Sequence, residues 1–433
     1  MNEIALTIVF ISMLFILLGS GIWVAVSLLG VAAVGMMMFT DRPVGDAMAT
    51  TIWGASSSWT LTALPLFIWM GEILFRTRLS EDLFRGLAPL MRRMPGGLLH
   101  VNIAGCAIFA AISGSSAATV ATVGKMSIPE LRKRGYPERM ITGTLAGAGT
   151  LGLLIPPSII LIIYGVTVNE SIAKLFVAGV LPGIMLAVLF MGYVAVWGYL
   201  RRRRNEESES LEALGTTRQV FLLVPVVLLI ASVMGSIYAG VATATEAAVL
   251  GVVGALLLSG LQGSLNRRSF MESLLGATRT SAMIAFILAG SSFLSLCMGF
   301  TGLPRGLAQW IAGLDLSPSM LIAALTVFYI VLGCFLDGIS AVVLTMAVIE
   351  PLVRQSGFDM IWFGIFLVVV VEMAQITPPI GFNLFVLQGM TGHDMGFIAR
   401  SALPMFLIMV LAVVLLSLFP EIATYLPQAM SNR

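Results

Sequence analysis

Long apolar runs constrain the fold of this chain more than any other feature. A membrane-spanning helix needs roughly 20 mostly apolar residues, and most of the runs approach or exceed that length. Only 11% of the residues are charged, against roughly 25% in an average soluble domain. The sequence therefore predicts an all-α polytopic protein held in a lipid bilayer. The runs cover 4–18, 22–39, 51–75, 98–124, 140–168, 175–200, 219–238, 241–262, 280–300, 320–349, 361–388 and 401–426.

The start of the chain is expected to remain in the membrane. The opening residues MNEIALTIVF contain no lysine or arginine, so they lack the basic segment of a cleaved signal peptide. A single helix over 4–39 would be about 54 Å long, which is too long for an ordinary span. We therefore expect a break at Gly19-Ser20-Gly21.

Cysteine and histidine are too sparse for a metal centre. Cys106, Cys297 and Cys334 lie far apart in apolar runs without CxxC spacing, which is typical of packing residues. His100 and His393 are the only histidines, which leaves no cluster for zinc. The sequence also has no HExxH or GxSxG motif. We therefore expect neither an enzyme nor a nucleic-acid-binding protein.

Basic residues flank the run 98–124 on both sides. Segments 76–96 and 125–139 each carry five lysines or arginines. Because these residues accumulate in cytoplasmic loops, a single crossing by 98–124 would leave one cluster outside. We interpret 98–124 as a re-entrant hairpin that enters and leaves from the cytoplasmic side. Ser113-Gly114-Ser115-Ser116 is suited to its turn.

The same scheme turns the run 320–349 into a second hairpin, which enters from the periplasmic side and turns near Asp337-Gly338. It places 19 of the 24 basic residues in the cytoplasm, including the four arginines at 201–204. A single crossing by 98–124 would invert everything after it and place those arginines outside. The other five basic residues are Arg42, Lys174, Arg305, Arg354 and Arg433.

An internal repeat relates the two halves of the chain. One constant offset in residue number, which we call the repeat offset, takes Pro156-Pro157 to Pro378-Pro379 and superposes the two predicted hairpin turns. Each half contributes five crossings and one hairpin. Because five is odd, the second half is inserted upside down, as in many secondary transporters. The repeat offset also aligns Pro129 with Pro351, Gly135 with Gly357, and Pro182 with Pro404.

We accordingly predict two inverted repeats, 1–204 and 219–433, joined by a cytoplasmic linker over 205–218. Amphipathic segments at 79–94 and 303–316 precede the hairpins, and we expect them to lie in the membrane interface. The first repeat comprises helices over 4–75, the cytoplasmic-side hairpin 98–124, a broken helix over 140–168 and a helix over 175–200. The second comprises helices over 219–300, the periplasmic-side hairpin 320–349, a broken helix over 361–388 and a helix over 401–426.

Each Pro-Pro pair interrupts a helix inside the bilayer and frees backbone groups that cannot face lipid. Free carbonyls and hydroxyls suit Na⁺, and helix N-termini suit an anionic substrate. We expect a first Na⁺ site at Ser113, Gly114, Ser115, Ser116, Thr119, Thr150, Gly152 and Pro156. The expected second site comprises Asp337, Gly338, Ser340, Thr345, Gln375, Thr377, Pro378 and Asn383. The expected substrate contacts are Ser115, Ser116, Ser158, Thr377 and Gly381.

Plainer roles stay open for these residues. Serine and glycine also allow close helix packing, and a Pro-Pro pair can be a simple kink. Asp337 could ligate Na⁺, carry a proton or cap a helix. Glu246 has the spacing of a capping box with Thr243. Glu372 could face the interior, and the sequence offers no evident partner for it.

Several long motifs occur in order along nearly the whole chain. They are SGSSAATVATVGKMSIPELRKRGYPERM from Ser113, GTLGLLIPPSIILIIYG at 149–165, YAGVATATEAAV at 238–249, GCFLDGISAVVLTM at 333–346 and ITPPIGFNLFVLQG at 376–389. On these residues the chain resembles the large membrane subunit of tripartite ATP-independent periplasmic (TRAP) transporters, of the DctM or SiaM type. Ala244 and Ala347 depart from the family pattern, which has proline at both places.

This resemblance implies a Na⁺-driven importer of organic acids, such as dicarboxylates, sialic acids or sugar acids, in the bacterial inner membrane. It implies a periplasmic substrate-binding protein, a small four-helix membrane subunit of the DctQ or SiaQ type, and an elevator motion of the hairpins and broken helices. The two Na⁺ sites correspond to the constellations given above. The alternative is a stand-alone carrier similar to Na⁺/dicarboxylate symporters, which needs no binding protein.

Overall fold

The protein is all-helical throughout the part that the computed structural model describes, and no strand occurs there. Six of its helices are long and apolar enough to cross a membrane, or seven spans if one bent pair counts as a single span. This confirms the predicted all-α polytopic membrane protein. The described residues are 9–10, 12–14, 16–17, 20–57, 59–76, 79–91, 94–202, 217–301, 317–334, 336–378 and 381–431.

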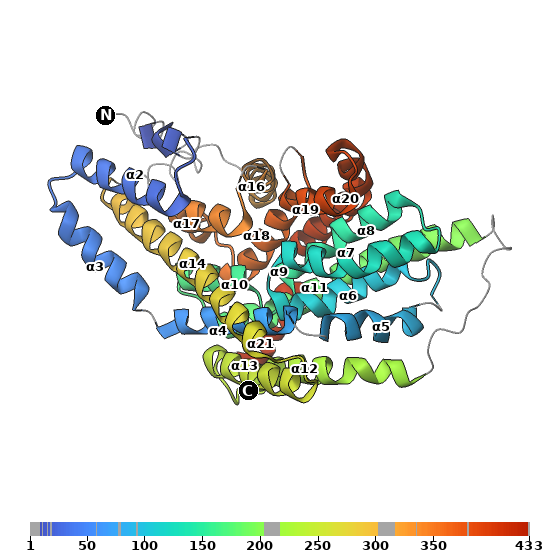
Figure 1. The fold of residues 1–433 in the computed structure, drawn as a ribbon. Coiled ribbons are helices and arrows are strands. Elements are labelled where there is room, and N and C mark those ends of the chain that lie inside the picture. The colour runs from blue at the N-terminus through green and yellow to red at the C-terminus, as the bar shows by residue number, and fades with distance from the viewer. Residues whose placement is uncertain are drawn as a thin grey trace.

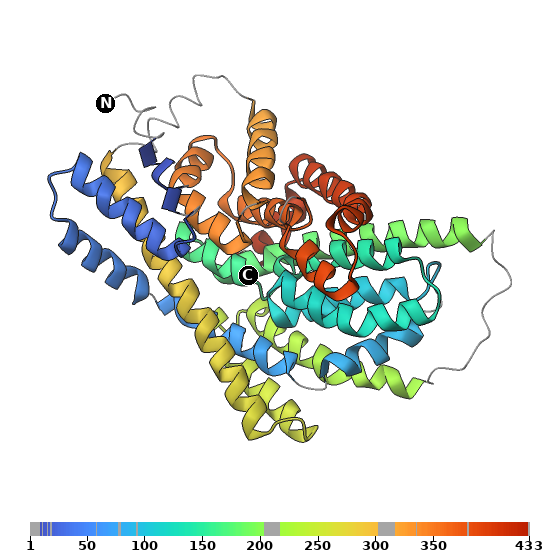
Figure 2. The same ribbon diagram turned by 45° about the horizontal axis from the view of Figure 1, so that its top comes forward.

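One group of helices is arranged along α14 (Arg267–Thr301), which contacts α2, α3 and α4, while α13 lies along α4 and α12 along α13. Figures 1 and 2 both show α14 running from the end with α2 and α3 to the end with α12 and α13. The other helices of this group are α2 (Val24–Phe39), α3 (Val44–Ser56), η1 (Trp59–Thr62), α4 (Ala63–Phe75), η2 (Thr217–Leu223), α12 (Val224–Tyr238) and α13 (Ala244–Leu261).

A second group surrounds α18 (Met360–Gln375), in which every residue from Trp362 to Gln375 is buried. A helix that is apolar on all sides belongs in a core. Six members contact α18 directly: α9 (Leu151–Leu154), α10 (Ile159–Val168), α16 (Pro318–Gly333), α17 (Gly338–Gln355), α19 (Phe382–Thr391) and α20 (Met395–Leu418). Three others pack on these helices: α6 (Leu99–Ser113) and α7 (Ser116–Lys133) on α9, and α8 (Glu138–Gly149) on α20.

Two further elements connect the groups. The long α11 (Ile172–Arg202) contacts α6, α18 and α20 of the second group and α12 of the first. The amphipathic α5 (Leu79–Met91) lies where an interfacial helix is predicted, between α4 and the first hairpin. The other predicted amphipathic segment, 303–316, lies outside the described residues, as does most of the predicted linker.

The repeat offset recurs in the helix boundaries. Applied to Ser116 and Lys133, the ends of α7, it gives Gly338 and Gln355, the two ends of α17. It also takes the first residue of α8 to the first residue of α18. Each of these pairs is followed by a break and a second short helix, α10 or α19. The sequence repeat therefore corresponds to a repeat of helix positions.

Three of the apolar runs predicted from the sequence are each divided by a break in the structure. The break within 4–39 is confirmed by a turn at Ser20-Gly21, where Gly21 has a φ of +81°. The run 51–75 is not one helix: α3 ends at Ser56 and α4 begins at Ala63. The serines at 56–58 favour local side-chain hydrogen bonds over a continuous helix. The run 401–426 is likewise divided, at Pro420, into α20 and α21 (Glu421–Ser431), because proline cannot continue the helix.

Candidate functional site

The first hairpin turns where the sequence predicts. α6 ends at Ser113, Gly114 adopts a left-handed conformation with a φ of +55°, and Ser115 caps α7 by accepting a hydrogen bond from the N–H of Ala118. The Ser113 and Thr119 hydroxyls are 2.8 Å apart, and Thr119 donates to the Ser115 carbonyl at 2.7 Å. Hydroxyl and carbonyl oxygens are thus concentrated at the tip.

The tip of this hairpin rests directly on the first helix break. A Cβ on Gly114 would lie 3.2 Å from the carbonyl oxygen of Pro157. A Cβ on Gly152 would lie 2.6 Å from the Cα of Ser116 and 2.8 Å from the carbonyl oxygen of Ser115. An added Cβ would therefore clash with backbone at Gly152, and at Gly114 the tight contact and the left-handed φ both favour glycine. The structure therefore brings the two parts of the first predicted constellation together.

The first break lies between α9, which ends at Leu154, and α10, which begins at Ile159. Pro156 and Pro157 are joined by a cis peptide bond, and the chain bends by 41°. Ser158 caps α10 by accepting from the N–H of Leu161 at 3.3 Å, and its hydroxyl donates to the carbonyl of Leu153. Ser158 thus satisfies backbone groups on both sides of the break. The Thr150 hydroxyl donates to the carbonyl of Gly147 at 2.6 Å.

At the second hairpin, Asp337 caps α17. One carboxylate oxygen accepts from the N–H groups of Ile339 and Ser340, at 3.1 and 3.2 Å, and the other accepts from the Ser340 hydroxyl. This confirms the capping role among the three that the sequence leaves open. The capping box of Thr243 and Glu246 at the start of α13 is confirmed as well.

The second tip also faces the break of its own repeat, between Gln375 and Phe382. The Cys334 thiol lies 3.5 Å from the carbonyl oxygen of Pro378 and 3.9 Å from that of Thr377. Gly381 has a φ of +32°, and a Cβ there would lie 2.8 Å from the Thr377 carbonyl oxygen. The Thr377 hydroxyl itself donates to the carbonyl of Met373 at 2.7 Å. Pro379 lies outside the described residues.

Thr345 differs from the other predicted ligands in its surroundings. Its hydroxyl is 2.7 Å from that of Tyr329 and donates to the Ala341 carbonyl at 2.8 Å. It lies two turns beyond Asp337, or about 12 Å along α17. Thr345 therefore joins the two arms of the hairpin and lies away from the tip.

The sequence indicates no partner for Glu372, which lies on α18 in the second group. Glu372 and Asn383 are fully buried and Gln375 nearly so. Among the described residues, no hydrogen-bond partner occurs for either Glu372 oxygen, for Gln375 Nε2, or for Nδ2 and Oδ1 of Asn383. The one available signal was the repeat, because the repeat offset takes Thr150 to Glu372.

The buried groups of the second repeat reach the first constellation. Ser116, at the start of α7, faces the Glu372 carboxyl. The Asn383 Nδ2 atom lies 3.5 Å from the position of a Cβ on Gly149, one residue before Thr150. Ser116 of the first predicted site and Asn383 of the second thus each lie against a residue of the opposite half of the chain.

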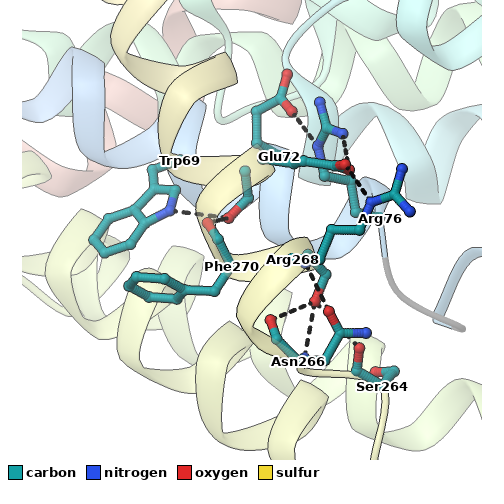
Figure 3. A network of polar contacts seen from close by, with 10 residues as sticks. Trp69, Glu72, Arg76, Ser264, Asn266, Arg268 and Phe270 are labelled. Carbon is teal, nitrogen blue, oxygen red and sulfur yellow. Dashed lines mark hydrogen bonds and ion pairs between the residues drawn. The ribbon is translucent and has the colours of Figure 1, made fainter.

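A separate polar network joins α4 to α14 (Figure 3). Arg76 lies 3.0 Å from Glu72 and 3.1 Å from Glu272, and Glu272 also pairs with Arg268 at 2.8 Å. These charges are partly exposed and mutually paired, so they link the two helices and do not form a ligand site.

Within the described ranges no cluster of three His, Cys, Asp or Glu side chains could hold a metal ion, and the three cysteines are free and buried.

Known proteins of similar sequence and fold are membrane transporters. The chain is 31% identical over 397 residues to the C4-dicarboxylate TRAP transporter large permease protein DctM of Pseudomonas aeruginosa. The alignment covers 91% of this chain and 92% of that protein. It is 31% identical over 414 residues to the isethionate TRAP transporter permease protein DctMQ of Oleidesulfovibrio alaskensis, with coverage of 94% and 63%. The solved Alcanivorax borkumensis YdaH transporter matches the fold with a TM-score of 0.65 at 14% identity, over 92% of this chain and 96% of that one.

The apolar helices and the two hairpin tips on helix breaks define a polytopic membrane transporter. Residues 11–422 match the family model of the tripartite ATP-independent periplasmic transporter, DctM component, and the chain belongs to this family. It is therefore a transport permease of the bacterial cytoplasmic membrane and not an enzyme.

Proposed function

We propose that the chain imports a small organic acid by Na⁺-coupled elevator transport and receives that substrate from a periplasmic binding protein. The observation that carries the proposal is the contact of each hairpin tip with the helix break of its own repeat, at Gly114 with Pro157 and at Cys334 with Pro378. Two occluding tips on two breaks are suited to alternating access around a central site.

The residues at the tips fit Na⁺, which prefers oxygen ligands. Hydroxyl and carbonyl oxygens of Ser113, Ser115 and Thr119 are concentrated at the first tip. The carboxylate of Asp337 and the carbonyls of Thr377 and Pro378 lie at the second. These residues would hold the ions, whose role is to couple uptake to the Na⁺ gradient. Thr345 is left out of the proposed site because it lies about 12 Å along α17 from Asp337 and its hydroxyl bonds to Tyr329 on the other arm.

The N-termini of α7 and α10 supply the anion-binding part of the site. Ser115 and Ser158 cap these helices where the tip meets the break. Helix N-termini favour negative charge, so a substrate carboxylate is expected between them. The names of the two relatives, a C4-dicarboxylate and an isethionate transporter, support a small organic anion as the substrate class.

The ion pairs support the inverted arrangement of the repeats. Glu138 pairs with Arg132 at 2.6 Å and contacts His393 at 3.0 Å, and all three fall in segments that the charge pattern assigns to the cytoplasm. Arg354 and Glu170, 3.8 Å apart, both fall in segments assigned to the periplasm. Contacts thus join residues predicted on the same side, from opposite halves of the chain.

The grouping of helices supports an elevator motion. We propose that the helices around α18, with both hairpins, move as one body against the group along α14, which is held together by the network of Arg76 and Glu272. The relative named DctMQ, of which this chain covers 63%, supports a small DctQ-type subunit as a partner of the static group.

The test is uptake into proteoliposomes that contain this chain and its small subunit. Labelled organic acids are supplied with and without an inward Na⁺ gradient and the cognate binding protein. The proposal expects uptake only when both are present. Uptake without the binding protein would indicate the stand-alone carrier, and uptake indifferent to Na⁺ would overturn the assigned ion sites.

A further inference from the structure

Glu372 is an exceptional buried group in the described part of the chain. It lies in α18 and is fully buried, and beside the Ser116 hydroxyl it faces, neither carboxylate oxygen makes a hydrogen bond of normal geometry within the described residues. None of the ion pairs formed by the described residues includes it. A carboxyl in such a place is strongly disfavoured as a bare anion: it either holds a proton or has a positive charge beside it.

The polar groups near Glu372 offer oxygen ligands. Ser116 faces the carboxyl, and its hydroxyl can accept as well as donate. Gln375 lies one helical turn farther along the same side of α18. Asn383, whose amide atoms have no partner in the described structure, approaches Gly149, which packs on Val120, one turn along α7 from Ser116. Ser116 of α7 thus lies beside Glu372 of α18, and Asn383 of α19 lies against α8 about one turn along α7 from Ser116.

The first hairpin offers a bound cation no charged ligand of its own. The predicted first Na⁺ site consists of serines, threonines, glycines and one proline, none of which is charged. The N-termini of α7 and α10 meet there, and their partial positive charges disfavour a cation. At the second hairpin Asp337 provides a carboxylate. The corresponding carboxylate against the first hairpin is Glu372, and it comes from the opposite half of the chain.

We propose that Glu372 is the charged ligand of a monovalent cation, Na⁺, bound between the first hairpin and α18. The Ser116 hydroxyl and the Asn383 carboxamide oxygen are its neutral companions. The inference rests on the proposed Na⁺ coupling and adds a ligand that the repeat alone does not assign. The bound cation would join α7 of the first half to α18 of the second.

The test measures Na⁺ binding through thermal unfolding of the purified full chain, with choline replacing Na⁺ at constant ionic strength. A ligand that binds the folded state raises the unfolding temperature as its concentration increases. E372Q keeps the size of the side chain and removes its charge. Because even the loss of a supporting ligand weakens metal binding 10–100-fold, E372Q should raise the half-maximal Na⁺ concentration at least about tenfold. E130Q, which removes the pair partner of Arg134 on α7, should respond like the wild type.

The outcomes separate this inference from the proposed function. A normal Na⁺ response in E372Q, beside a normal wild type, would overturn the inference and leave the coupling intact. A wild type without a Na⁺ response would overturn both. If E372Q does not fold, S116A decides the question, because an unchanged Na⁺ response in that variant contradicts the assigned site.

Discussion

The Arg354 guanidinium donates a 2.9 Å hydrogen bond to the carbonyl of Val168, the last residue of α10. In the other repeat, Arg132 donates at 3.2 Å to the carbonyl of Thr391, the last residue of α19. The repeat offset relates the two arginines, and each lies at the end of a second hairpin arm. The last carbonyls of a helix lack partners within it and attract cations. Each hairpin is therefore attached to the broken helix of the opposite repeat.

Removing either arginine contact should loosen the end of a broken helix. In R354Q the Val168 carbonyl loses a charged donor, and because the side chain is partly exposed the cost should be about 1 kcal/mol. Amide hydrogen exchange should become faster in the last turn of α10, and in R132Q in the last turn of α19. R134Q, which removes only a pair within α7, is the control. Unchanged exchange in both helices would contradict the attachment.

The contact between the first hairpin tip and the helix break predicts that a side chain added at Gly152 displaces the tip and impairs transport. A Cβ there would lie within 3 Å of backbone atoms of Ser115 and Ser116, which cannot move aside as a flexible side chain can. G152A should displace the hairpin tip at a cost of about 1–3 kcal/mol. Because small misplacements at a working site can cost 10²-fold in rate, uptake should fall at least about tenfold.

The matched control is G192A in α11, where nothing lies within 4 Å of an added Cβ. Alanine favours a helix over glycine, so this variant should transport normally and unfold no earlier than the wild type. Equal uptake by G152A and G192A would show that the tip does not need its close approach to the break.

The sequence predicts the hairpin turns and helix breaks well because their signals are local. Gly114 and Asp337-Gly338 occur where the backbone needs a left-handed residue or a cap, and the helices before Pro156 and Pro378 end two and three residues ahead of them. Hydropathy alone does not detect the break after Ser56, because three serines interrupt an otherwise apolar run. The contact of Ser116 with Glu372 could not be predicted, because the two residues come from different repeats and share no local pattern.

Asp337 has a capping role that can be separated from its charge. Asparagine caps helices about as well as aspartate, whereas alanine costs about 1 kcal/mol. D337N should therefore unfold at nearly the wild-type temperature, and D337A lower. If the carboxylate also binds Na⁺, D337N should need more Na⁺ for half-maximal uptake. Wild-type Na⁺ dependence in D337N would restrict Asp337 to the cap that the structure shows.

Thr345 distinguishes a structural hydroxyl from an ion ligand. The buried Tyr329 hydroxyl has Thr345 as its partner at 2.7 Å. T345V keeps the side-chain shape but leaves that hydroxyl without this partner, which should cost about 1–3 kcal/mol of stability. Because Thr345 bonds between the hairpin arms, the Na⁺ concentration for half-maximal uptake should stay unchanged. T345S, which keeps the hydroxyl, should recover most of the stability. A shifted Na⁺ dependence in T345V, with T345S normal, would instead return Thr345 to the second ion site.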